Sequence, residues 1–100
     1  MTLGATKRRV LVDLNVSPTD EGHILVAVTP ADWERLRHQL GGDPINGMEV
    51  LFYDEDQDEL GKRDDLIVEG HLLVDVPSRH CFGVVDWQQL RHESDAPRRL

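Results

Sequence analysis

The sequence predicts a mainly β protein with one helix, folded as a small five-stranded barrel or as a strongly bent antiparallel sheet. Five short segments have the apolar patterns of β-strands, and turn-forming residues separate them. One further segment, between the second and third strands, has apolar side chains at helical spacing. The predicted order is therefore β-β-α-β-β-β, an α+β arrangement.

The chain length of 100 residues fits one domain. We expect a globular part at residues 9–92, with flexible tails at residues 1–8 and 93–100. A single cysteine, Cys81, excludes an intrachain disulfide and is compatible with a reducing compartment. No apolar run approaches the ~20 residues that cross a bilayer. We therefore expect a cytoplasmic protein without a membrane segment.

The charge is strongly negative and unevenly distributed. The formal net charge is −8, and residues 10–90 hold 17 acidic but only 5 basic side chains. The remaining basic residues lie near the two ends of the chain. An acidic body repels phosphate backbones, so nucleic acid is disfavoured as a partner. Another protein with a basic surface is the partner that the charge favours.

The first two strands are predicted on either side of a turn. In residues 9–16, Val10 and Val12 begin an alternation of apolar and mixed side chains, so this strand has one buried face. Pro18 and Gly22 belong to the following turn. Residues 23–28 are apolar on both faces except at His23, which predicts a central strand.

A helix is predicted at residues 30–40. Thr29 fits the N-cap, Pro30 the first helical position and Asp32 the reciprocal position of a capping box. Trp33 and two leucines then recur at helical spacing, and two glycines at 41 and 42 end the helix. We expect Trp33 to pack on the sheet.

Three further strands follow, at residues 48–53, 66–76 and 81–86. The second is long enough to turn a barrel corner, and Gly70 within it predicts a bend or a bulge. Asp86 is placed to cap a helical turn at residues 87–92, with Trp87 facing the core. An SH3-like barrel with a helix inserted after its second strand accounts best for this order.

One part of the chain resembles the swapped-hairpin regulators and antitoxins of the AbrB type. The strand segment 26–28 runs into Thr29 and Pro30, a short helix follows, and Gly47 precedes another strand. The resemblance implies a regulatory homodimer built by exchanging hairpins. The basic residues that such proteins present to DNA are mostly missing from this sequence, which is a departure from the family pattern.

The stretch YDEDQDELGKRDD, residues 53–65, is the densest cluster of charge. Its aspartates at 54, 56 and 58 match the first ligand positions of an EF-hand, but Glu59 replaces the required glycine and Asp65 the bidentate glutamate. We therefore interpret the stretch as a charged hairpin loop that meets a basic protein surface. The predicted protein-binding residues are Tyr53, Asp54, Glu55, Asp56, Asp58 and Glu59.

Other reactive residues give little support for catalysis. His71 and Asp86 are expected to meet across the last two strands, and this pair carries the alternative hypothesis of a small enzyme. Cys81 fits a buried core cysteine better than a thiol activated by Arg79 and His80. The histidines and the cysteine form no zinc pattern. We expect a non-enzymatic binding or structural module with no metal, no cofactor and no catalytic residues.

Overall fold

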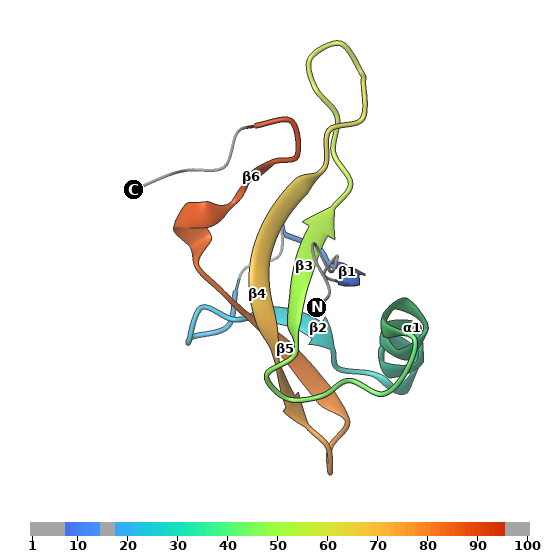
Figure 1. The fold of residues 1–100 in the computed structure, drawn as a ribbon. Coiled ribbons are helices and arrows are strands. Elements are labelled where there is room, and N and C mark those ends of the chain that lie inside the picture. The colour runs from blue at the N-terminus through green and yellow to red at the C-terminus, as the bar shows by residue number, and fades with distance from the viewer. Residues whose placement is uncertain (1–7, 15–17, 96–100) are drawn as a thin grey trace, which may run out of the picture.

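Six strands and one α-helix form the part of the chain that the computed structural model describes, residues 8–14 and 18–95 (Figure 1). The mainly β character and the single helix are confirmed. No helix within these residues is long and apolar enough to cross a membrane. The elements, in chain order, are β1 (Arg8–Leu11), β2 (Ile24–Ala27), α1 (Pro30–Leu40), β3 (Glu49–Asp54), β4 (Leu66–Asp75), β5 (His80–Val85), the 3-10 helix η1 (Trp87–Gln89) and β6 (Arg91–His92).

The strands form one curled, mixed sheet. Its order is β1-β3-β4-β5-β2, and β6 pairs with the first residues of β4. The predicted all-antiparallel pairing is wrong for β1, which runs parallel to β3. Parallel neighbours need a long crossover connection, and the segment that contains β2 and α1 provides it.

The central position predicted for residues 23–28 is also wrong, because β2 lies at an edge of the sheet and pairs with β5. Ile24 and Ala27 face the core, whereas Leu25 is 44% exposed. The apolar pattern on both faces of β2 therefore reflects a core on one side and an open apolar surface on the other. Residues 15–17, at the end of the first predicted strand, lie outside the described residues.

Two glycines in the central strands lie where a side chain would not fit. The Phe52 side chain of β3 is completely buried and occupies the space of a side chain at Gly83 in β5, whereas a Cβ at Gly70 in β4 would first meet the Val84 backbone oxygen and the Val85 side chain. A Cβ atom at Gly83 would come 2.5 Å from the tip of this ring. Gly70 lies in an unbroken register, so the predicted bulge does not occur there; the register shift lies in β2, between Leu25 and Ala27.

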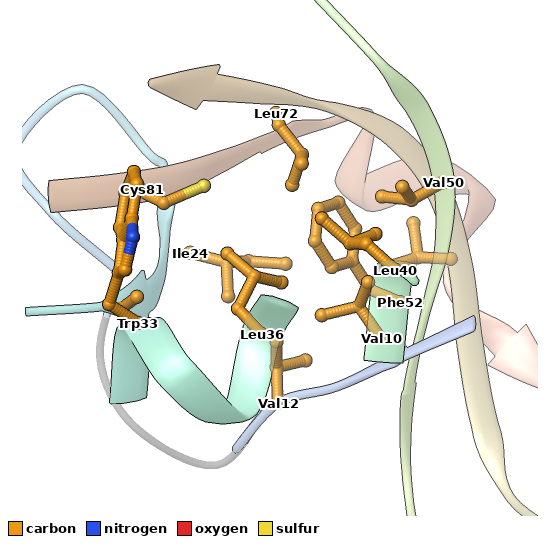
Figure 2. Packing of buried hydrophobic residues seen from close by; sticks show 12 residues of the cluster. Val10, Val12, Ile24, Trp33, Leu36, Leu40, Val50, Phe52, Leu72 and Cys81 are labelled. Carbon is orange, nitrogen blue, oxygen red and sulfur yellow. The ribbon is translucent and has the colours of Figure 1, made fainter. Parts of the chain in front are cut away.

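The helix closes the core on the concave side of the sheet and contacts both edge strands, β1 and β2. Its predicted start and end are confirmed. Thr29 accepts a hydrogen bond from the Asp32 backbone N–H, Asp32 accepts one from the Thr29 backbone N–H, and Gly41 ends the helix in the left-handed conformation. Figure 2 shows the buried side chains: Val10, Val12, Ile24, Trp33, Leu36, Leu40, Val50, Phe52, Leu72 and Cys81.

The C-terminal part of the domain folds back along β4 (Figure 1). Asp86 caps η1 by accepting a hydrogen bond from the Gln88 N–H, as predicted. Trp87 is half-buried at the core and donates its indole N–H to the Gly22 carbonyl oxygen, 2.8 Å away. The helical turn predicted at residues 87–92 ends after η1, and Arg91–His92 form the short strand β6 instead.

Parts of both predicted tails have defined contacts. Arg8, from the predicted N-terminal tail, is the first residue of β1. Glu93, from the predicted C-terminal tail, donates its backbone N–H to the Asp65 carbonyl oxygen. The other residues of the predicted tails that lie in 1–7 and 96–100 are outside the described residues.

The packing of Phe52 makes a prediction about Gly83. Replacing Gly83 with alanine should lower the free energy of unfolding by about 1–3 kcal/mol, because the new Cβ overpacks a filled core. Gly42→Ala is the matched control, since a Cβ there meets nothing within 4 Å and should change stability by less than about 0.5 kcal/mol. Urea denaturation measures both, and equal stability of the two variants would contradict the packing argument.

Candidate functional site

The predicted acidic residues lie at the end of β3, where Asp54 is the last residue, and on the hairpin loop that projects from the sheet between β3 and β4 (Figure 1). A bridge between Gln57 and Arg63 holds the two arms together. At the tip, the Asp58 carboxylate accepts hydrogen bonds from the N–H groups of Leu60 and Lys62, both at 2.9 Å. Asp58 therefore stabilises the turn of the loop, as aspartates commonly do.

The six predicted residues make different contacts within the chain. Tyr53 contacts Arg9 of β1, and Asp56 contacts His92 of β6. Asp54 and Glu55 line a groove between the two sheet edges. Asp58 orders the tip, and Glu59 is exposed there.

The contacts of the first group form an ionic clasp that joins β1, the loop and the C-terminal segment. Arg9 is its centre: its guanidinium carbon lies 4.9 Å from the centroid of the Tyr53 ring, and its nitrogens lie 3.6 Å from Asp65 and 3.1 Å from Glu93. The Tyr53 ring therefore makes a cation–π contact with an arginine of the same chain. The ionic clasp consists of Arg9, Tyr53, Asp56, Arg63, Asp64, Asp65, His92, Glu93 and Ser94.

Asp65 is the buried carboxylate of the clasp, with 5% of its surface exposed. Arg63 donates two hydrogen bonds to it, at 2.9 and 3.1 Å. This bidentate pairing is the main reason that the pKa of Asp65 is lowered from 3.8. The side chain is therefore an anion at neutral pH, and its charge is matched within the fold.

His92 and Asp56 connect the loop to β6, with 2.8 Å between the histidine Nε2 and a carboxylate oxygen. This hydrogen bond is the main cause of a raised pKa at His92 and of a lowered pKa at Asp56. The contribution of His92 to stability is fully present below pH 6.5 and is lost as the pH rises through its raised pKa. The contribution of Asp56 is present above pH 3.8 and is lost as the pH falls through its lowered pKa.

The second group of residues lines an open groove between β1, β2 and the start of α1. Its volume is about 520 Å³, within the range of ligand sites. Apolar side chains from both edge strands form much of its wall, and three of these are notably exposed: Leu11 at 39%, Leu25 at 44% and Val28 at 43%. This edge groove is lined by Leu11, Val12, Asp13, Leu25, Val26, Val28, Asp32, Arg35, Asp54 and Glu55.

Negative charge predominates in the edge groove, because four carboxylates and one guanidinium line it. Arg35 lies 3.0 Å from Asp32 and balances one of these charges. Asp54 accepts a hydrogen bond from the Leu14 N–H, and Glu55 lies 3.8 Å from Arg63. The groove therefore combines exposed apolar surface with a net negative charge.

No local pattern in the sequence indicates the edge groove, because its residues come from four separate segments. One feature of the sequence is consistent with the groove. Leu25 and Val28 belong to a segment without the polar alternation of a half-buried strand. That pattern fits both a central strand and an edge strand with an apolar outer surface, and only the pairing of β2 distinguishes them.

The pair proposed for catalysis does not form. His71 lies opposite Val84 in the β4–β5 register, and Asp86 caps η1. No hydrogen bond or ion pair joins His71 to Asp86. The three aspartates of the EF-hand-like pattern also have separate partners: Asp54 bonds to Leu14, Asp56 to His92, and Asp58 to its own loop. Within residues 8–14 and 18–95, no group of three or more His, Cys, Asp or Glu residues is arranged to hold a metal ion.

Cys81 points into the core and has no exposed surface (Figure 2). Burial raises the pKa of its thiol to about 12, and neither Arg79 nor His80 offsets that effect. The thiolate form that reacts with electrophiles is therefore strongly disfavoured.

Comparison with known proteins returned no match: no family model, no curated protein and no solved structure is similar to this chain.

The His92–Asp56 contact predicts a change in titration. Asp56→Asn should lower the pKa of His92 towards 6.5, because the hydrogen-bonded charge that favours the imidazolium is removed. Histidine ring signals followed by NMR against pH measure the shift. Glu59→Gln, on the same loop, should leave the titration of His92 unchanged. An unaltered pKa in Asp56→Asn would show that the contact does not persist in solution.

Burial of Cys81 predicts an inert thiol. A chromogenic disulfide reagent at about pH 8 should label the native protein far more slowly than the same protein in denaturant, since the folded state shields the sulfur and disfavours the thiolate. Comparable labelling rates with and without denaturant would contradict the buried position.

Proposed function

We propose that this protein is a non-enzymatic, cytoplasmic binding module whose edge groove binds a basic segment of another protein. One observation carries the proposal: an open groove of about 520 Å³ combines exposed apolar side chains with four carboxylates and a single arginine. Apolar contact supplies affinity at protein interfaces, and complementary charge supplies selectivity and faster association.

The edge groove fits this role better than the tip of the acidic loop. Glu59 is exposed but has only Leu60 as an apolar neighbour on the loop, and Leu60 is 93% exposed. The groove offers apolar walls from two strands together with the carboxylates of Asp54 and Glu55.

We also propose that the curled sheet is an SH3-like barrel that is open between β1 and β2, with α1 inserted after β2. The order of the strands along the chain and the contacts of α1 with both edges support this assignment. The parallel pairing of β1 with β3 distinguishes it from a fully antiparallel barrel.

We propose a monomer as the working form. In the AbrB-type alternative, hairpins are exchanged between two chains. Here each described strand finds its partner within one chain: β2 pairs with β5, and β3 pairs with β1 and β4. Hairpin exchange is therefore not required to complete the sheet.

The proposal predicts a charge effect that is specific to the groove. Two pools of labelled ten-residue peptides provide the probe, one mixing valine, leucine, lysine and arginine, the other with glutamate in place of the basic residues. The wild-type protein should bind the basic pool preferentially. Glu55→Lys should weaken this binding by about three- to tenfold, because it reverses a charge beside the ligand.

Glu59→Lys is the matched control, since it makes the same change on the same loop but outside the groove. It should alter affinity far less than Glu55→Lys. An equal or larger effect of Glu59→Lys would move the contact to the loop tip. Equal binding of the basic and acidic pools to the wild-type protein would contradict the proposed function. Thermal unfolding of both variants checks that each one is folded.

A further inference from the structure

The two edges of the sheet differ in how they are covered. The outer edge of β1 meets α1, where the Leu11 N–H donates a hydrogen bond to the Gln39 side-chain oxygen at 2.7 Å. Among the strands of residues 8–14 and 18–95, β2 pairs with β5 alone, and its four residues, Ile24–Ala27, include no charged side chain and no proline. Natural sheets usually protect an open edge with such residues, because unpaired backbone groups attract another strand.

From this difference we infer that the edge groove binds its partner as an additional β-strand, paired with the outer edge of β2. This inference rests on the proposed function and specifies the conformation of the bound segment. The added strand lies in the groove beside Leu25, and its backbone N–H and C=O groups pair with those that β2 leaves open.

The side chains near β2 determine which residue types the added strand should contain. On the outer face of the sheet, Leu73, Phe82 and Leu25 lie opposite one another in register across β4, β5 and β2. One set of alternate side chains of an added strand extends this apolar row. Basic side chains on the added strand would meet the four carboxylates that line the same groove. A segment that alternates apolar and basic residues matches both surfaces.

The pairing with β2 is short. β2 has four residues, and its register shifts between Leu25 and Ala27. A few backbone hydrogen bonds contribute only about 0.5–1.5 kcal/mol each, so side-chain contacts in the groove have to supply much of the affinity. Sequence preference should therefore accompany the extended conformation.

A second copy of this chain is a poor occupant by charge. Its own β2, Ile24–Ala27, has no basic side chain, and the carboxylates of the same groove flank it. The formal charge of −8 on each chain adds general repulsion. The favoured occupant is therefore an extended segment of a different, basic protein.

The test uses a labelled ten-residue peptide of alternating lysine and valine. Four comparison peptides accompany it: the same residues in two blocks, glutamate in place of lysine, N-methylation of the valine amides, and N-methylation of the lysine amides. Alternate N–H groups of a strand point to opposite sides, so one methylated peptide should lose at least about tenfold in affinity while the other binds nearly normally.

Two protein variants locate the contact. Leu25 and Leu73 belong to the same apolar row and have similar exposure, 44% and 40%, but only Leu25 lies on the open edge. Leu25→Lys should weaken binding of the alternating peptide by about tenfold, because it places a charge on the edge strand and next to a basic ligand. Leu73→Lys makes the same change in net charge and should have a much smaller effect.

The outcomes separate the two proposals. Preferential binding of the alternating peptide, with one sensitive methylation pattern and a sensitive Leu25→Lys variant, supports strand addition. Equal binding of the alternating and block peptides, insensitive to both methylation patterns, overturns strand addition and leaves the binding of basic segments intact. Equal binding of lysine and glutamate peptides overturns both proposals. Self-association of the protein that Leu25→Lys abolishes would identify a second copy as the occupant and overturn the inference.

Discussion

The close packing of one aromatic ring, Phe52 of β3, is the constraint on which the core of this protein depends. The ring is completely buried and occupies the space that a side chain at Gly83 in β5 would fill, so β5 can cross it only with glycine at that position. The curl of the sheet places both edges within reach of α1, which contacts β1 and β2. The edge groove lies where those two strands and the start of the helix come together. A flatter sheet would carry the same side chains without forming that concave surface.

The negative charge of the chain has two different roles in this fold. In the ionic clasp, carboxylates such as Asp56 and Asp65 pair with His92 and with Arg63 and hold the loop against the C-terminal segment. Around the edge groove, one arginine faces four carboxylates. Three of these carboxylates, Asp32, Asp54 and Glu55, also have partners within the chain, and together with Asp13 they give the groove its negative character. The formal charge of −8 does not distinguish these two groups.

The local elements could be predicted from the sequence, whereas the edge groove could not. The capping box of Thr29 and Asp32 and the left-handed Gly41 depend on residues within one helix, so their signals are local. Of the six residues predicted to bind a partner, Asp54 and Glu55 line the edge groove, while Tyr53 and Asp56 belong to the clasp. Arg9 and His92, the partners of Tyr53 and Asp56, are distant from them along the chain, so no local spacing rule predicts these contacts.

The sequence alone determined the mainly β character, the single helix and the net negative charge, because periodicity, capping and composition act over a few residues or over the whole chain. The tertiary structure decided that β1 runs parallel to β3, that β2 is an edge, and that Arg9 meets Glu93 across 84 positions of sequence. These contacts join segments that are distant along the chain. Their free energy depends on how all the strands pack together, and therefore no single segment specifies them.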